Sequence, residues 1–452
     1  MTFETLKDRI RGNVIAVFDP GHAAAADALV WNGRKPERRA RVIVRAADAA
    51  DVQEAVRYAA AHGISVSART GGHQFTGIAA RAEMVIDLAA LDGLRIDVTG
   101  RTADVGPGVT NARLAAALDR HGLGFPVGHC GDVTLGGYLL GGGVGWNSGE
   151  WGIACFSVLS VEVVMADGRL LTATAGSHPD IFWAARGAGP DFFGIVTGYR
   201  VRLHAGPRAL TTVARVYPSA AAEDVAAWAE RAIARAPANV EFTAKVDAGP
   251  GGPVIAAVAN VFAADDAGAR EICADLGRDA PAGALDVVGP MPTPIPQLYG
   301  MTGQSSPKGS RYGVDSLWSD GGFGEALARV VDSIGRAPSG TSFGLVALRS
   351  NARPSPRDAA FSREGRVFVT LYGIWADPAG DDANLAWLRA SVDGCRSFAT
   401  GSYVGESDLD RPGTPIPTLS AEAAGRLAAL RQLHDPMGSF GDSAGRGSCS
   451  AA

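Results

Sequence analysis

Two glycine-rich segments carry residue types that could bind a phosphorylated ligand and react with it. The first reads Ser67-Ala-Arg-Thr-Gly-Gly-His73-Gln, and the second runs from Gly128 through Cys130 to Trp146. Glycines at this density let backbone N–H groups approach a pyrophosphate with no side chain in between. The same segments supply an imidazole, which is a nucleophile when neutral, and a thiol, which reacts as its thiolate.

Other phosphate-binding patterns are absent from the sequence. The chain contains neither G-x-G-x-x-G nor G-x-x-x-x-G-K-[ST], so a Rossmann site and a Walker P-loop are not supported. The eight histidines show no H-x-H or H-E-x-x-H spacing, and we therefore expect no metal site.

A strand–helix–strand unit positions the first glycine-rich turn. Val42–Val44 reads as a strand, and Asp48 is a plausible N-cap for a helix that extends to Ala61. Gly63 is a plausible C-cap, and residues 64–69 form the next strand, which ends in the Gly-Gly-His turn. The predicted unit places His73 at the end of a strand.

The remaining chain predicts an α+β protein of two domains. Residues 1–206 are expected to form a cofactor domain, 207–399 a substrate domain of antiparallel sheet covered by helices, and 400–452 a segment that returns to the first domain. We interpret Pro290–Pro296 as a loop within the second domain.

Composition excludes several functions. A formal charge of -5 over 452 residues, without a basic run, argues against nucleic-acid binding. The five cysteines are widely spaced and favour a reduced, cytoplasmic protein. Charged residues interrupt the N-terminal 31 residues, so we expect no signal peptide. No apolar stretch reaches 18 residues, so we expect no contact with a membrane.

Several motifs in one order resemble a known flavoprotein family. They are Arg69-Thr-Gly-Gly-His73, Gly128-His-Cys130 with Val133, Gly136 and Gly137, the run from Gly141 to Trp146, and Trp183 to Gly189 followed by Phe193-Gly-Ile-Val196. The chain resembles the FAD-linked oxidases of the vanillyl-alcohol oxidase and p-cresol methylhydroxylase (PCMH) superfamily, in the berberine bridge enzyme-like branch. The resemblance implies a two-domain PCMH-type fold and bound FAD.

The resemblance also implies a doubly covalent flavin. In this family the histidine of the Gly-Gly-His turn bonds to the 8α-methyl carbon, and the cysteine of the second segment bonds to C6. The matching residues are His73 and Cys130. The alternative for Cys130 is a small buried hydrophobic residue, which is the common fate of a free cysteine.

Further residues are expected around the flavin. Val133 matches a position that in this family controls oxygen access, where valine goes with oxidases; it could instead be a packing residue. His129 could hydrogen-bond near the flavin or be a plain loop histidine. The complete set of candidate cofactor residues is His73, Cys130, Arg69, Thr70, Gly71, Gly72, His129, Val133, Gly136, Gly137, Gly142, Trp146, Ile195 and Val196.

The catalytic base is where the sequence departs from the family. Many members carry Tyr-x-Asn-Tyr near the C-terminus, whereas this chain reads Tyr403-Val404-Gly405-Glu406. Glu406 could replace the phenol as base if burial raises its pKa, or it could be a surface carboxylate. Tyr403 is the alternative base. Tyr372 lies on one face of the alternating strand Val367–Trp375, as either a substrate contact or a core aromatic residue.

These features predict an FAD-dependent oxidase. It would transfer hydride from an alcohol or activated C–H bond of a bulky natural product or sugar to flavin N5, and O2 would reoxidise the flavin to give H2O2. The alternatives are a flavin-dependent dehydrogenase or oxidative cyclase of natural-product biosynthesis, and a flavoprotein that sequesters a small molecule without turnover.

Overall fold

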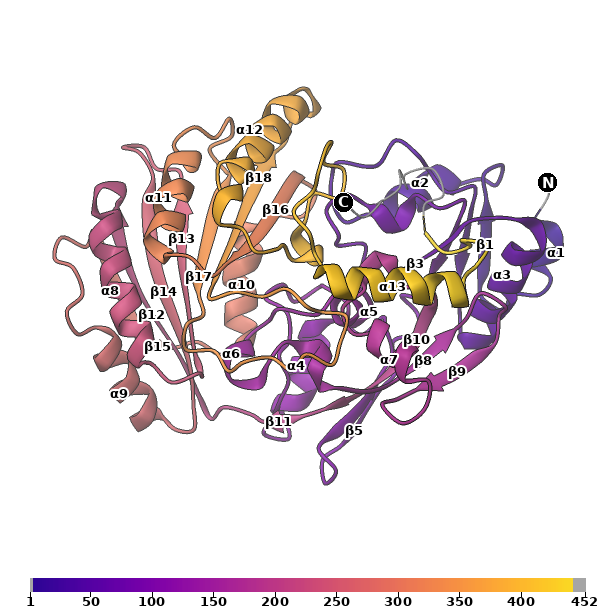
Figure 1. Ribbon diagram of the computed structural model, residues 1–452, viewed down its shortest axis with the longest axis horizontal. Helices are drawn as coiled ribbons and strands as arrows, with labels where there is room; N and C mark the ends of the chain where they lie inside the picture. The colour runs from indigo at the N-terminus through magenta and orange to yellow at the C-terminus, as the bar shows by residue number, and fades with distance from the viewer. Residues whose placement is uncertain (1–2, 442–452) are drawn as a thin grey trace.

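The computed structural model describes residues 3–441. Its two halves lie side by side (Figure 1): a seven-stranded sheet with its helices on the left, and two smaller sheets with theirs on the right. The predicted α+β class is confirmed.

The first small sheet carries the Gly-Gly-His turn. Its strand order is β1-β2-β4-β3, with β2, β4 and β3 parallel; the strands are β1 Asn13–Ala16, β2 Val42–Arg45, β3 Val66–Arg69 and β4 Met84–Asp87. Helix α3 (Ala49–His62) connects β2 to β3. The Asp48 carboxylate accepts a bond from the Asp51 N–H at its start, and Gly63 ends it with a left-handed φ of 64°. Both predicted caps are confirmed.

The second small sheet is antiparallel, in the order β5-β6-β10-β8-β9. Its strands are β5 Leu94–Asp97, β6 Thr102–Val105, β8 Val158–Val164, β9 Leu170–Ala173 and β10 Ile195–Arg202. The other elements of this half are α1 Glu4–Lys7, α2 His22–Ala28, α4 Asn111–Asp119, α5 Leu135–Leu140, α6 Ser148–Trp151, α7 Pro179–Ala184, and the short strand pair β7 Leu123–Gly124 with β11 His204–Ala205.

The large sheet is antiparallel throughout, as predicted. Its order is β15-β12-β14-β13-β17-β18-β16, with β12 Ala209–Pro218, β13 Val240–Asp247, β14 Val254–Ala263, β15 Asp286–Pro292, β16 Arg311–Ser319, β17 Phe343–Leu348 and β18 Val367–Trp375. One face is covered by α8 Ala222–Arg235, α9 Asp266–Leu276, α11 Phe323–Ile334 and α12 Asp381–Asp393 (Figure 1).

One interpretation of this half is wrong. The Pro290–Pro296 stretch is not a loop, because its first residues belong to β15 and the last begin helix α10 (Ile295–Ser305). Proline is compatible with both places: β15 is an edge strand that pairs only with β12, and Pro296 lies in the first turn of α10.

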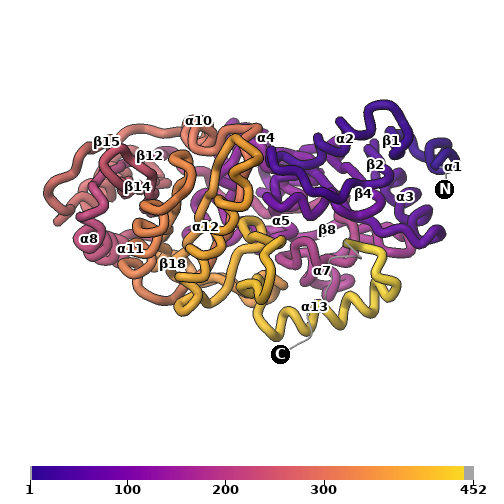
Figure 2. Tube along the Cα trace, turned by 90° about the horizontal axis from the view of Figure 1, so that it is seen from above, coloured from indigo at the N-terminus to yellow at the C-terminus, as the bar shows by residue number. Residues whose placement is uncertain are grey.

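The C-terminal segment crosses from the large sheet to the smaller sheets. At its start, Trp318 N–H on β16 donates to Gly401 O at 2.7 Å. Helix α13 (Ala421–His434) then packs on α7, and Phe440 bridges to Val66 of β3. Figure 2 shows α13 beneath the right-hand half, beside α7.

A buried ion network fixes the part of this segment that precedes α13. The Arg411 guanidinium lies 2.9 Å from the Asp315 carboxylate of β16, and both side chains are buried. The second Asp315 oxygen accepts a bond from Asp408 N–H at 3.2 Å. Tyr403 N–H also donates to Ser316 Oγ on β16. The residues between 401 and 411 are therefore held against one strand edge.

No helix in residues 3–441 is both long and apolar enough to cross a membrane.

We expect Arg411→Ala to lower the free energy of unfolding by roughly 3–5 kcal/mol, because it leaves Asp315 as an uncompensated buried charge. Urea unfolding curves measure the change. The matched control is Arg336→Ala, which removes an exposed pair with Asp332 and should cost at most about 1 kcal/mol. Equal losses in the two variants would contradict the structural role of Arg411.

Candidate active site

A cavity of about 1050 Å³ lies between the two halves. The glycine-rich turns line one side, and the uncovered face of the large sheet lines the other. On β18 the four residues of one face all reach it: Phe368, Thr370, Tyr372 and Ile374. The alternation of this strand therefore identified its cavity face.

The Gly-Gly-His turn is shaped by close backbone approach. Gly72 has a φ of +69°, and a Cβ there would lie 2.0 Å from Leu29 O, so only glycine fits. The Arg69 side chain contacts the same carbonyl group, because its Nε–H donates to Leu29 O at 2.9 Å. The Arg69 guanidinium also forms an ion pair with Asp87. The Arg69 guanidinium therefore braces the turn through partners within the protein.

A hydroxyl pair joins the two glycine-rich segments. Thr134 Oγ1 donates to Thr70 Oγ1 at 2.7 Å, and a Cβ at Gly71 would lie 2.9 Å from the Thr134 hydroxyl. The second segment therefore packs directly on the first. This contact brings His73 and Cys130 to the same end of the cavity, although they lie far apart in sequence.

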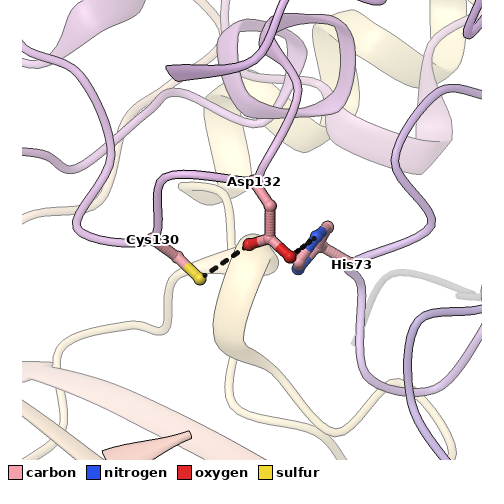
Figure 3. Close-up of side chains that lie close together, drawn as sticks. All are labelled: His73, Cys130 and Asp132. Atoms are coloured by element: carbon pink, nitrogen blue, oxygen red, sulfur yellow. Dashed lines mark hydrogen bonds and ion pairs between the residues drawn. The ribbon is translucent and has the colours of Figure 1, made fainter. Parts of the chain in front are cut away.

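Asp132 lies between these two side chains (Figure 3). The Cys130 thiol donates to one carboxylate oxygen at 3.1 Å, and His73 Nε2 lies 3.5 Å from the other. Burial and the Asp132 charge raise the pKa of the Cys130 thiol to about 12. The hydrogen bond with His73 lowers the pKa of Asp132, so the carboxylate stays ionised.

Most of the candidate cofactor residues line the cavity; Gly142 and Ile195 do not. A Cβ at Gly142 would strike the Phe361 ring, so this glycine faces a neighbouring loop. Ile195 is buried in the core beneath the parallel strands. The cavity is lined by His73, Cys130, Arg69, Thr70, Gly71, Gly72, His129, Val133, Gly136, Gly137, Trp146 and Val196.

All three candidate catalytic residues line the same cavity. Glu406 is partly buried beside Thr370 and Tyr372, and removal from bulk water raises the pKa of its carboxyl group, while His129 lowers it less. Within residues 3–441, Glu406 Oε2 has no hydrogen-bond partner. Burial raises the pKa of both the Tyr403 and Tyr372 phenols, so neither is readily ionised.

The segment Tyr403-Val404-Gly405-Glu406 is packed tightly at Gly405. A Cβ at Gly405 would lie 2.7 Å from the Tyr403 ring. The Tyr403 ring occupies the space that an asparagine side chain would need. A short 3₁₀ turn, Val404–Glu406, then directs the chain so that Glu406 reaches the cavity.

Two residues that line the cavity form an ion pair that the sequence analysis did not predict. His129 Nε2 lies 2.6 Å from Glu241 Oε1 on β13, and the other Glu241 oxygen accepts a bond from Asn147 N–H. Burial lowers the pKa of His129, but Glu241 outweighs it and the net pKa is raised. Glu241 therefore favours the protonated form of His129, whose ring meets that of Trp146 edge-on with ring centroids 4.2 Å apart.

Comparisons with known proteins identify the class of this site. An FAD binding domain family matches residues 40–174. The FAD-linked oxidoreductase ptmO of Penicillium ochrochloron is 30% identical over 428 residues, which is 93% of this chain and 94% of that protein. (R)-6-hydroxynicotine oxidase of Paenarthrobacter nicotinovorans is 36% identical over 200 residues, covering 44% of this chain and 43% of that enzyme.

Solved structures agree on the fold. The BBE-like 1 protein of Physcomitrella patens superposes with a TM-score of 0.85 at 19% identity, over 97% of this chain and 98% of that one. The fold and site thus define a flavin-dependent oxidoreductase. The chain belongs to the FAD-linked oxidoreductases and it binds FAD, and it shares the fold of the BBE-like 1 protein.

The cavity fits this cofactor on two counts. Trp146 Nε1 is buried in its wall with no hydrogen-bond partner within residues 3–441, as expected of a group that faces a polar ligand. A Cβ at Gly137 would meet no atom within 4 Å, so bare backbone is presented to the cavity.

We expect Glu241→Gln to lower the pKa of His129, because the carboxylate that stabilises the imidazolium is lost. His129 would then lose its proton at a lower pH. Deuterium exchange at the imidazole C2 carbon, followed by mass spectrometry across pH, measures this. An unchanged titration would contradict the ion pair, and Glu422→Gln, on exposed α13, serves as the control.

Proposed function

We propose that this protein is an FAD-dependent oxidase with a doubly covalent flavin. It would oxidise an alcohol or activated C–H bond of a bulky natural product or sugar. FAD held in this cavity would supply a hydride acceptor at N5, and O2 would take the electron pair to give H2O2. The observation that carries the proposal is a cavity with His73 and Cys130 together at one end and a partly buried carboxyl group, that of Glu406, in its wall.

The two halves of the molecule would have different roles. We propose that residues 1–206 hold the cofactor, that 207–399 bind the substrate, and that 400–452 return to the first part while supplying Glu406; residues 1–2 and 442–452 lie outside the described chain. The uncovered face of the large sheet supports this division, because it supplies the side chains that line the cavity opposite the glycine-rich turns.

His73 and Cys130 are suited to bond the two sites on the benzenoid edge of the flavin. A nitrogen of His73, the Cys130 sulfur and a carboxylate oxygen of Asp132 all lie within 4.8 Å of one another. The methyl carbon at position 8α and ring carbon C6 lie on that one edge, so two neighbouring nucleophiles can each reach one. Such bonds would retain the cofactor and raise its reduction potential.

Glu406 is the base that the geometry favours. A base must take the substrate proton at the pH of the reaction, and burial raises the pKa of the Glu406 carboxyl group, which makes its carboxylate a stronger proton acceptor. The raised pKa values of the Tyr403 and Tyr372 phenols make them less suitable as bases, because their anions become harder to form. Tyr372 lines the cavity with Glu406, and we propose that it positions the carboxyl group.

Val133 lines the cavity beside the cysteine loop, and its side chain is partly exposed there. A small β-branched residue at this place leaves room for a diatomic molecule next to the cofactor. This supports O2 as the electron acceptor.

The covalent part is tested by acid precipitation of the full chain. We expect yellow, fluorescent flavin to stay with the denatured protein of the wild type and of His73→Ala and Cys130→Ala, each through its remaining bond. The double variant should release all flavin to the supernatant. Flavin released entirely from the acid-treated wild type would contradict the covalent proposal.

For the base, we expect Glu406→Gln to lower kcat roughly 10²–10⁴-fold while bound flavin is retained. In the wild type, kcat/KM should fall as the pH drops through the Glu406 pKa, which lies above the ordinary 4.5, because protonation removes the base. The Glu406→Gln variant should not show this fall of kcat/KM at low pH. Glu422→Gln, at an exposed position, is the control. If kcat/KM of Glu406→Gln still falls at low pH as in the wild type, another residue is the base.

A further inference from the structure

Asp132 makes contacts that the proposed reaction itself does not use. Its two carboxylate oxygens are divided between the two residues proposed to bond the flavin: Oδ1 accepts from the Cys130 thiol at 3.1 Å, and Oδ2 lies 3.5 Å from His73 Nε2 (Figure 3). The carboxylate thus touches both reactive side chains while lying between them.

A third residue fixes this arrangement. Trp31 Nε1–H donates to Asp132 Oδ2 at 3.2 Å, and the Trp31 ring stacks on the His73 imidazole with centroids 5.0 Å apart. The imidazole is therefore held flat against the indole with Nε2 towards the carboxylate. A proton on Nε2 leaves the lone pair on Nδ1, at the opposite side of the ring.

We propose that Asp132 is a positioning residue for cofactor attachment: it assists the bond to His73, directs that bond to Nδ1, and opposes the bond to Cys130, so that the His73 bond forms first. This inference rests on the proposed function, because it presumes that both bonds are made.

Each attachment is an oxidation, and O2 is the oxidant. At His73, one C–H bond of the 8α-methyl group is replaced by a bond from that carbon to Nδ1, and the ring is a cation until Nε2 releases its proton. At Cys130, the C6–H and S–H bonds are replaced by a C–S bond. Each exchange releases two electrons and two protons, which convert one O2 to H2O2.

The charge of Asp132 has opposite consequences for the two residues. When Nδ1 bonds to carbon, Nε2 keeps its proton and the ring becomes a cation, which the adjacent carboxylate stabilises. Cys130 must instead become an anion next to an existing anion. Burial and Asp132 together raise the pKa of this thiol to about 12, so the reactive thiolate is scarce.

The test separates the two bonds. Cys130→Ala leaves only the His73 bond and His73→Ala only the Cys130 bond; each is combined with Asp132→Asn in the full-length chain. Protein is harvested at intervals after induction, and acid-stable flavin fluorescence per chain is measured on a denaturing gel. We expect Asp132→Asn to slow the His73 bond at least tenfold, and to leave the Cys130 bond as fast or faster.

Two controls make the outcome specific. Asp132→Glu keeps the charge and should restore much of the His73 rate. Asp92→Asn changes an aspartate of similar exposure, 56% against 55%, whose partner is Arg113. It should change neither rate.

An unchanged His73 rate in Asp132→Asn would overturn the proposal. An equal slowing of both bonds would also overturn it, because that result describes a damaged loop. A wild-type protein without acid-stable flavin is a different result, since it removes the covalent attachment itself and is read from the parent chain before any Asp132 variant.

Discussion

The site depends on the contact between two turns that are distant in sequence. Thr134 Oγ1 bonded to Thr70 Oγ1, with no room for a side chain at Gly71, sets one glycine-rich segment directly on the other. From that contact follow the proximity of His73 and Cys130, and the position of the cavity against the large sheet. The glycines of the two segments allow this close packing, and they also leave backbone without side chains facing the cofactor.

Local signals predicted the elements that local interactions decide. The caps of α3 were predictable because Asp48 and Gly63 act on neighbouring backbone. Alternation identified the cavity face of β18, because one face of that strand meets the cofactor side and the other meets helices. Strand β16 was not predicted, because its residues are almost all buried and show no alternation. Prolines concealed β15, whose edge position tolerates them.

The candidate site was predictable where its chemistry lies within one motif. His129 is the clearest limit: its partner Glu241 lies on a strand of the other half, and the pair exists only after the halves meet. One signal was present in the sequence, because Glu241 alternates with buried residues of β13 and so lies on the opposite face. Asp132 lies within the second glycine-rich segment, but its role depends on the position of Trp31, which belongs to an earlier part of the chain.

The central claim is that one flavin is bonded to His73 and Cys130. It is tested most directly by the intact mass of the denatured wild-type chain, followed by mapping of its peptides. The account predicts the chain mass plus one FAD less two hydrogen atoms for each bond, with the peptides containing His73 and Cys130 joined through the flavin. An intact mass equal to that of the unmodified chain, from protein that was yellow before denaturation, would contradict it.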